Sequence, residues 1–452
     1  MRVLLVSNYE LGHQPLHLAS PAAALRRAGH RVRCLDLSVE PFDPGVLETV
    51  EAVAFSVPMH TAMRLAMRVA RRVRERRPGL PVCFYGLYAP VSRDLTVGSL
   101  ADRMIGGEYE PALVRWVEEL DSGGPGSQTE GGEPVVVELG RTDFGVPARD
   151  LLPPLERYAR LQVGEERRLV GYVEASHGCR HRCRHCPIPP VYDGRIRVID
   201  REVVLADVAQ LVEMGARHIT FGDPDFLNGP HHSLRLAGEM HERFPELTFD
   251  CTTKVEHILR HNEVWPELAE AGCVFVVSAF ETTNDRILAL MDKGHTTAEA
   301  ARAVHLLREH GIEIRPSWLP FTPWTEVEDL ADILDFVAAH DLFDNVDPVQ
   351  LSIRLLIPEG SRFLDVPEIV PYLGDYDPEL LSYRWQSADP KADRLQERLA
   401  TVAAEGAERE EDRPVTLERM WEAIAEAAGR GEPQLPAGAT AGRPRLTEPW
   451  FC

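Results

Sequence analysis

The sequence lacks features that would place it at a membrane or on nucleic acid. No uninterrupted apolar stretch approaches the roughly 20 residues of a spanning helix, and the apolar part of the N-terminal MRVLLVSNYE is too short for a secretion signal. Basic residues are few, with 49 Lys and Arg against 71 Asp and Glu and a net charge of −22. Such a chain is a poor partner for nucleic acid or an anionic membrane surface. We therefore expect a cytoplasmic protein with neither partner.

Cysteine is also sparse, and its distribution does not suggest a disulfide framework. Of eight cysteines, Cys179, Cys183 and Cys186 form a C-x3-C-x2-C array in SHGCRHRCRHC, and the others are scattered. Three local thiolates are one short of the four that usually complete a structural zinc site or a fully protein-ligated iron-sulfur cluster. A 4Fe-4S cluster held by three thiolates keeps one iron open, and catalytic metals need an open position.

The same loop leaves a zinc site open as an alternative. Cysteine and histidine alternate in it, so His177, His181 or His185 would complete four ligands, because thiolate and imidazole both suit zinc. On that interpretation the chain is a non-catalytic zinc-binding protein. Iron and sulfide analysis after anaerobic reconstitution distinguishes the two.

The array, followed by Pro187 and preceded by the apolar run 169–173, resembles the radical S-adenosylmethionine (SAM) superfamily. The resemblance implies that SAM chelates the fourth iron and that the reduced cluster cleaves its sulfonium to a 5′-deoxyadenosyl radical. It also implies an external one-electron reductant of the flavodoxin or ferredoxin type. His185 stands where that family commonly has an aromatic residue that packs near adenine. We expect an enzyme that modifies a small molecule or metabolite, which the sequence does not identify.

Residues 1–120 alternate short strands and helices, as in a doubly wound parallel α/β domain. Ligands of such domains bind beyond the carboxyl ends of the strands, here 7–10, 57–61 and 86–89. The predicted strands are 2–7, 31–36, 52–56 and 82–85, and the predicted helices are 21–28, 62–77 and one from near 111. The order resembles the cobalamin-binding domain that precedes the barrel in one radical SAM subgroup. The D-x-H-x-x-G motif, which supplies a histidine ligand to cobalt in some relatives, is absent. Many members of the subgroup bind cobalamin without it, so the resemblance keeps cobalamin as a candidate cofactor, and an empty domain retained for packing is the alternative.

The rest of the chain divides by composition and periodicity. Residues 121–134 are rich in Gly, Ser and Pro and predict a flexible linker, 135–168 a tether, and 377–452 a helical C-terminal region with a flexible tail. Residues 169–376 repeat strand-helix units that resemble the partial (β/α)6 TIM-type barrel of radical SAM enzymes. The predicted strands are 170–174, 218–221, 248–252, 274–279, 313–319 and 349–356.

Polar residues gather at the carboxyl ends of these strands, where barrel active sites lie. The resemblance assigns SAM-binding roles to Gly222 and Asp223 (amino group) and to Ser278 and Glu281 (ribose). Arg315 is a candidate for the SAM carboxylate, and an exposed strand arginine is the alternative. A carboxylate suits an ammonium ion, and an arginine fork suits a carboxylate. Lys254 is a second candidate for the role of Arg315, whereas Asp225 and Asn228 fit a turn equally well.

The chain stops at TEPWFC. The domain order and the ending PWFC resemble radical SAM proteins that finish in Cys-Cys-Ala-Glu-Pro or Cys-selenocysteine-Ala-Glu-Pro. The resemblance implies truncation by four residues at a UGA codon, and it makes Cys452 a catalytic residue, one of a redox-active pair on a mobile tail. The alternative is a true terminus with an incidental thiol. The next twelve nucleotides of the gene distinguish them.

Overall fold

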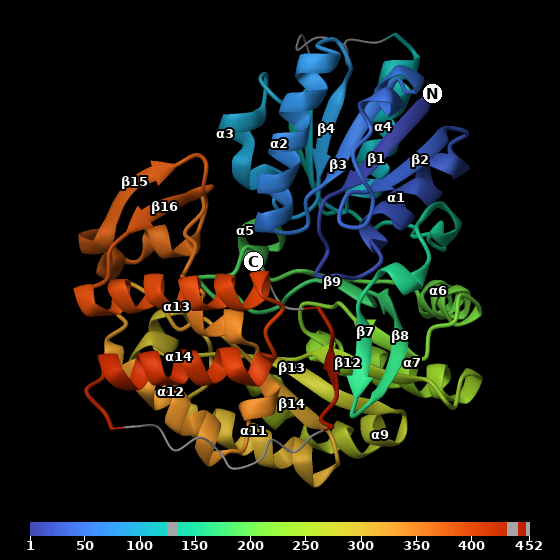
Figure 1. Ribbon diagram of the computed structural model, residues 1–452. Helices are drawn as coiled ribbons and strands as arrows, with labels where there is room; N and C mark the ends of the chain where they lie inside the picture. Colours follow the sequence, from blue (N-terminus) through green and yellow to red (C-terminus); the bar gives the residue numbers. More distant parts are fainter. Residues whose placement is uncertain (124–133, 432–441, 449–452) are drawn as a thin grey trace.

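The computed structural model describes residues 1–123, 134–431 and 442–448. In Figure 1 an N-terminal α/β domain sits above a curled half-barrel, and two C-terminal helices lie against one side of the barrel. No described helix has the length and apolar content that a membrane span requires. The arrangement confirms the predicted α/β fold class: a parallel N-terminal sheet, a partial barrel and a helical C-terminal region.

The N-terminal sheet is parallel, with strand order β2-β1-β3-β4-β5-β6. Its strands are β1 (Arg2–Ser7), β2 (Arg31–Asp36), β3 (Ala52–Ser56), β4 (Val82–Tyr85), β5 (Arg103–Gly107) and β6 (Val135–Glu138), and its helices are α1 (Leu16–Arg27), α2 (His60–Arg76), α3 (Arg93–Thr96) and α4 (Tyr109–Asp121). The first four strands match the predicted ranges. Val3 and Leu5 pack on the side of α1 and α4, whereas Leu4 and Val6 face α2. This alternation makes both faces of the sheet apolar, as double winding requires.

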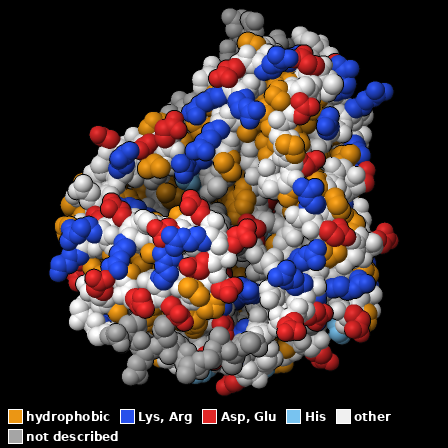
Figure 2. All heavy atoms as spheres, viewed as in Figure 1, with side chains coloured by type: hydrophobic (Ala, Val, Ile, Leu, Met, Phe, Trp, Pro, Cys, Tyr) orange, Lys and Arg blue, Asp and Glu red, His pale blue; other side chains and the backbone are white. Residues whose placement is uncertain are grey.

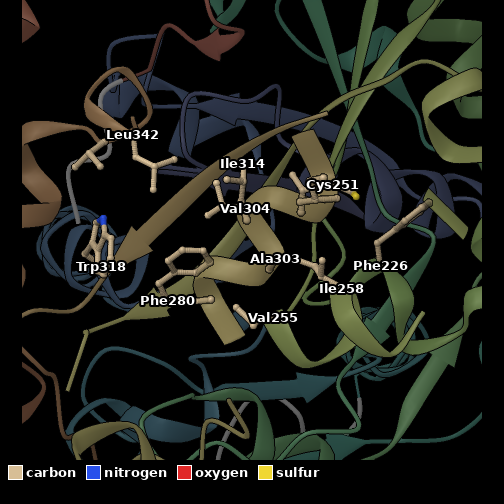
Figure 3. Packing of buried hydrophobic residues seen from close by; sticks show 14 of the residues in the cluster. Phe226, Cys251, Val255, Ile258, Phe280, Ala303, Val304, Ile314, Trp318 and Leu342 are labelled. Carbon is tan, nitrogen blue, oxygen red and sulfur yellow. The ribbon is translucent and has the colours of Figure 1, made fainter. Parts of the chain in front are cut away.

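The barrel sheet has the order β14-β13-β12-β11-β8-β7-β17. Its parallel strands are β8 (Glu166–Val173), β11 (His218–Phe221), β12 (Thr248–Thr252), β13 (Cys273–Glu281) and β14 (Glu313–Trp318). Its helices are α6 (Arg201–Glu213), α7 (Pro230–Arg243), α8 (Val255–Arg260), α9 (Trp265–Glu270), α10 (Asp285–Leu290), α11 (Thr297–Glu309) and α12 (Val327–Ala339). After β8 come β9 (Ser176–Gly178), α5 (Ile188–Tyr192) and β10 (Ile196–Val198). Figure 3 shows part of the core, where Cys251 and Ile314 from strands pack with Val255 and Val304 from helices.

The strand predicted at 349–356 does not form. Residues Pro348–Ser352 are a 3-10 helix, and the following stretch makes one isolated bridge, between Arg354 and Phe321. The proline has no N–H for a sheet ladder, and the guanidinium of Arg354 stacks 3.5 Å from the ring centroid of Trp385. The helices α13 (Pro390–Glu408) and α14 (Arg413–Ala427) pack against this segment and cover the β14 side of the barrel.

The segment predicted as a tether is shared between the two sheets. Its first strand, β6, pairs with β5 of the N-terminal sheet, whereas β7 (Arg160–Val163) pairs antiparallel with β8 of the barrel. Most of the predicted linker, 124–133, lies outside the described residues. The predicted boundaries stay proposals, and we refine them by assigning β6 to the N-terminal domain.

The C-terminal region begins with a hairpin of β15 (Leu373–Asp377) and β16 (Ser382–Trp385), before α13 and α14. Part of the predicted flexible tail is instead ordered into a sheet, because β17 (Arg445–Leu446) pairs antiparallel with β7. Beyond it, Glu448 accepts a hydrogen bond from the Tyr9 hydroxyl at 3.3 Å, so the described chain reaches the loop after β1.

A buried arginine connects the tether to both parts of the protein. Arg149 is 1% exposed and donates to both carboxylate oxygens of Asp207 on α6, at 2.9 and 2.8 Å. It also donates to the Tyr172 carbonyl of β8 at 2.6 Å and to Gln14 Oε1 of the N-terminal domain at 3.2 Å. These bonds satisfy a guanidinium that water does not reach.

We predict that Arg149→Leu lowers the free energy of unfolding by about 3–5 kcal/mol, because the Asp207 carboxylate stays buried without its partner. Denaturant unfolding followed by circular dichroism measures it. The double variant Arg149→Leu/Asp207→Leu should recover much of the loss, since it buries no charge. In the control, Arg26→Leu removes a pair with Asp150 whose side chains are 40% and 65% exposed, which should cost less than about 1 kcal/mol. Equal losses in the two single variants would contradict this account.

Candidate active site at the carboxyl ends of the barrel strands

The three clustered cysteines lie in the loop after β8. Cys179 and Cys183 are buried, and Cys186 is half-buried. Antiparallel pairing of β9 with β10 closes the segment that contains the loop. The Cys186 N–H donates to the Cys183 carbonyl at 3.3 Å, and the Arg184 N–H donates to the Met291 carbonyl at 2.9 Å. The loop is thereby folded against the segment that follows α10.

The three thiol sulfur atoms do not all lie within 4.8 Å of one another. Among the described residues, one set of three His, Cys, Asp or Glu side chains has all its ligand atoms within 4.8 Å of one another, and that set contains no cysteine. Tetrahedral zinc, with bonds of about 2.0–2.3 Å, holds its ligand atoms within about 4 Å of one another. The spacing therefore favours a multi-atom cluster over the zinc alternative.

Two buried lysines place positive charge near the thiols. Lys254 Nζ lies 3.6 Å from Cys183 Sγ. Lys293 Nζ lies 2.8 Å from Glu281 Oε1. Burial lowers the pKa of Lys293, but the charges of Glu281 and Cys183 outweigh burial and raise the pKa above its ordinary value. Two ammonium groups offset the negative charge of metal-bound thiolates.

Gly222 and Asp223 follow β11 and lie beside the start of the loop. A Cβ at position 222 would stand 1.9 Å from the Tyr172 hydroxyl, so only glycine fits. Asp223 is buried and accepts hydrogen bonds from the Ala175 N–H at 2.9 Å and the Ser176 hydroxyl at 2.5 Å. Burial outweighs these bonds and raises the pKa of Asp223 to about 7. Asp223 therefore positions the loop, and its contact with the SAM amino group stays a prediction.

The end of β13 brings together His185, Ser278 and Glu281. Glu281 has φ +65° at an irregularity in the β13–β14 register, a strained conformation that re-aims its side chain. Its carboxylate contacts His185 Nε2 at 3.0 Å and Lys293. Burial raises the pKa of Glu281, but Lys293 and His185 outweigh it and hold the pKa well below its ordinary value. Within the described chain, Ser278 Oγ and His185 Nδ1 are buried without a hydrogen-bond partner, which fits a ligand such as SAM.

Other predicted residues are placed differently. Asn228 Oδ1 accepts a hydrogen bond from the Arg180 N–H at 3.2 Å, so this side chain holds the cluster loop. Arg315 is not brought to the loop: its guanidinium pairs with Asp347 at 3.0 Å, on the connection that follows α12. Cys452 lies outside the described residues.

Sequence reasoning missed Lys293 and His295, in the stretch DKGH. His295 is buried, and neither ring nitrogen has a hydrogen-bond partner within the described chain. Burial and the charge of Lys293 lower the pKa of His295 to about 4, so its imidazole is neutral. Gly294 has φ +76°, and a Cβ there would stand 2.8 Å from the Glu256 carboxylate. The available signal was a lysine, a glycine and a histidine together on one turn.

A cavity of about 200 Å³ lies between the N-terminal domain and the barrel. The N-terminal domain lines it with the loops after β1, β3 and β4, the three ligand edges predicted from the sequence, through residues such as Glu10, Met59 and Leu87. The barrel lines it with residues such as Tyr172 and Gly222. On the face shown in Figure 2, the surface is hollowed between the two parts.

His177 connects the two domains beside this cavity. Its Nδ1 lies 3.0 Å from Glu108 Oε2 and its Nε2 lies 3.0 Å from Glu174 Oε2. His17 also approaches Glu174, at 3.4 Å, and the Tyr192 hydroxyl donates to Glu108 at 3.0 Å. Burial lowers the pKa of His177, but the two carboxylates outweigh burial and raise the pKa well above its ordinary value. Both ring nitrogens of His177 are therefore engaged by carboxylates, which disfavours a role as a zinc ligand.

Curated proteins are similar to this chain at low sequence identity. The tRNA-2-methylthio-N(6)-dimethylallyladenosine synthase of Vibrio parahaemolyticus is 26% identical over 263 residues, which cover 54% of this chain and 54% of that protein. The hopanoid C-3 methylase of Methylococcus capsulatus is 25% identical over 327 residues, 69% of this chain and 62% of that protein. The chain thus spans about half to three fifths of the length of these relatives.

Solved structures share the fold. The cobalamin-dependent S-adenosylmethionine radical enzyme OxsB with aqua-cobalamin bound superposes with a TM-score of 0.68 at 14% identity, over 88% of this chain and 66% of that one. The radical S-adenosylmethionine methyltransferase TsrM from Kitasatospora setae superposes with a TM-score of 0.65 at 18% identity, over 88% of both chains.

Two family descriptions match separate parts of the sequence. The B12 binding domain matches residues 2–115, the part that forms most of the N-terminal sheet. The Radical SAM superfamily matches residues 173–337, which contain the three cysteines and the parallel strands that follow them. The chain therefore combines a B12-binding domain with a radical SAM domain.

Proposed function

We propose that this protein is a radical SAM enzyme in which Cys179, Cys183 and Cys186 hold a 4Fe-4S cluster and SAM binds the open iron. The observation that carries the proposal is the placement of three thiols, which do not all lie within 4.8 Å of one another, at the carboxyl end of a parallel half-barrel. When bound, the cluster would supply the electron that cleaves the sulfonium, and an external flavodoxin- or ferredoxin-type protein is the proposed electron source.

The surrounding residues have distinct roles in this proposal. Asp223 fixes the first residues of the loop, and Ser278 and His185 offer buried polar atoms to the ribose and adenine of SAM. Because Arg315 is engaged by Asp347, we assign the SAM carboxylate to Lys254, whose ammonium group already lies beside Cys183. Gly222 lets the backbone pass close to the Tyr172 ring, and the segment of Gly222 and Asp223 stays the proposed site of the SAM amino group.

The N-terminal domain is the proposed cobalamin site. Its strand-end loops meet at the cavity, and Glu10 Oε2 there is buried without a hydrogen-bond partner within the described chain. Pockets for drug-sized ligands have about 300–1,000 Å³, so a corrinoid needs these loops to part. Methyl transfer to an unactivated carbon or phosphorus centre is the proposed reaction, supported by the names of the hopanoid methylase and of TsrM.

A small molecule or metabolite is the proposed substrate. Two relatives modify tRNA or hopanoids by name, but the net charge of −22 disfavours a polyanion. The face in Figure 2 mixes acidic and basic side chains. The cytoplasm is the proposed location, because the seven described cysteines are unpaired, as in a reducing compartment.

Cys452 stays a proposed catalytic residue. Glu448, four residues before it, is hydrogen-bonded to Tyr9, next to Glu10 and Leu11 of the cavity wall. Four extended residues span at most about 14 Å. That length bounds how far from Glu448 the thiol can act.

We predict that replacing Cys179, Cys183 and Cys186 by alanine abolishes the brown chromophore and reductive SAM cleavage, because the loop then offers no thiolate to iron. Iron and sulfide per chain, measured after anaerobic reconstitution, and 5′-deoxyadenosine formation test it. Cys34→Ala, in β2 of the N-terminal sheet, is the matched control and should keep the brown chromophore and SAM cleavage. A reconstituted wild type that holds no iron, with zinc that is lost when the three cysteines are replaced, would refute the enzyme proposal.

We predict that Ser278→Ala weakens SAM binding about 2- to 10-fold, the equivalent of one hydrogen bond of about 0.5–1.5 kcal/mol. The unfolding free energy of the SAM-free protein should stay level or rise, because the variant removes a buried hydroxyl without a partner. Calorimetry of SAM binding and denaturant unfolding measure the two effects.

Ser382→Ala is the control for this prediction. Ser382 is buried and accepts a hydrogen bond from the Ile357 N–H at 2.8 Å, so its removal should lower stability by about 1–3 kcal/mol without affecting SAM binding. A Ser278→Ala variant that loses stability and binds SAM normally would assign Ser278 to the fold alone.

We predict that the reconstituted protein retains a corrinoid through gel filtration and that Leu87→Trp reduces this retention at least tenfold, because the larger ring occupies the cavity. Visible absorption of the eluted protein measures it. Arg68→Trp, on the exposed face of α2, should bind like the wild type. If the wild type retains no corrinoid, the domain serves packing alone.

A further inference from the structure

His181, Asp225 and His257 form a compact group beside the cluster loop. Their ligand atoms are the set, among the described residues, that lie within 4.8 Å of one another. His181 Nε2 lies 3.2 Å from His257 Nε2 and 3.6 Å from Asp225 Oδ2, and His257 Nδ1 lies 2.9 Å from Asp225 Oδ2. We propose that these residues bind a second metal, zinc or another divalent transition ion, at a site separate from the cluster.

The three residues come from three different elements. His181 lies in the loop between Cys179 and Cys183, Asp225 follows β11, and His257 lies in α8 after β12. Two imidazoles and one carboxylate are a recurrent ligand set for zinc and for iron(II). An ion bound here would clamp the cluster loop to the ends of two strands.

The hydrogen bond between the Nε2 atoms of His181 and His257 does not account for the whole group. His257 Nδ1 is buried and has no hydrogen-bond partner within the described chain, although Asp225 Oδ2 is only 2.9 Å away. The distance is short, but the direction does not suit an N–H···O bond. Ligand atoms that share an ion approach one another in this way, because each directs its lone pair at the ion.

The burial of Asp225 also favours a bound metal ion. Its side chain is fully buried, and its Oδ1 is occupied by the Leu227 N–H at 3.0 Å. Its Oδ2 faces the two imidazoles and accepts a hydrogen bond from the Lys254 N–H at 3.4 Å. A buried carboxylate requires a compensating positive charge, and a divalent ion between these groups provides it.

A carboxylate behind His181 completes the arrangement. Glu256 Oε2 lies 3.6 Å from His181 Nδ1 and 3.7 Å from Lys254 Nζ. Metal-bound histidines commonly direct their other ring nitrogen at a carboxylate, which orients the ring. Glu256 thus directs the Nε2 of His181 toward Asp225 and His257, while Lys254 lies on the side of the cluster thiol Cys183.

The test uses the full chain with Cys179, Cys183 and Cys186 replaced by alanine, so that zinc cannot bind the thiolates of the cluster loop. The chelator-treated protein is incubated with zinc chloride, desalted, and analysed for metal. We expect about one zinc per chain. Adding His257→Gln or Asp225→Asn should weaken zinc binding at least tenfold, and cobalt in place of zinc should show no thiolate charge-transfer bands. The site involves no SAM chemistry, so this result is independent of the proposed function.

His261→Gln is the matched control, since its ring lies 5.5 Å from that of His257 and is not in the group. It should keep one zinc. Equal zinc binding in the His257→Gln and His261→Gln proteins, or no zinc in the starting protein, overturns the proposal. If the alanine protein does not fold, the same variants are compared in cluster-reconstituted protein, where iron occupies the thiols. There His181→Gln, on the partly exposed loop, must also lose the zinc.

Discussion

The structure depends on one constraint: two parallel sheets present their carboxyl ends to each other. The cavity between them is lined on one side by the loops after β1, β3, β4 and β5 and on the other by the loops after β8 and β11. In open parallel sheets and in barrels, ligands bind at this end of the strands. A ligand of the N-terminal domain and a ligand of the barrel would therefore meet in one space, and the cysteine loop lies at its border.

Where the two sheet edges face each other, buried acidic and basic side chains lie close together and form ion pairs. His177 stands between Glu108 of the N-terminal domain and Glu174 of the barrel, while Lys293 and His185 share Glu281 near the thiols. A buried charge without a partner would strongly destabilise the fold. The contacts of His177 with Glu108 and Glu174 connect the N-terminal domain to the barrel.

Much of the fold was predictable, because buried parallel strands are short apolar runs with clear ends. β1, β2, β3, β4, β11 and β12 match their predicted ranges. β5, with the sequence RMIGG, was missed because two glycines weaken the pattern, and 349–356 was misread because apolar composition alone does not exclude a 3-10 turn. The cysteine array located the candidate site in the sequence. The contacts of Arg315 with Asp347 and of Lys254 with Cys183 depend on tertiary packing, which periodicity does not encode.

The cluster loop is held from several sides before any ligand binds. Asp223 binds its start, Asn228 binds the Arg180 N–H near Cys179, and the Met291 carbonyl binds the Arg184 N–H. Ligand sets act only when their supporting contacts fix them within a fraction of an ångström. Such a loop can present three thiolates in one arrangement, so differences in reaction among proteins with this fold should arise from the residues around the cavity, where the two strand ends meet.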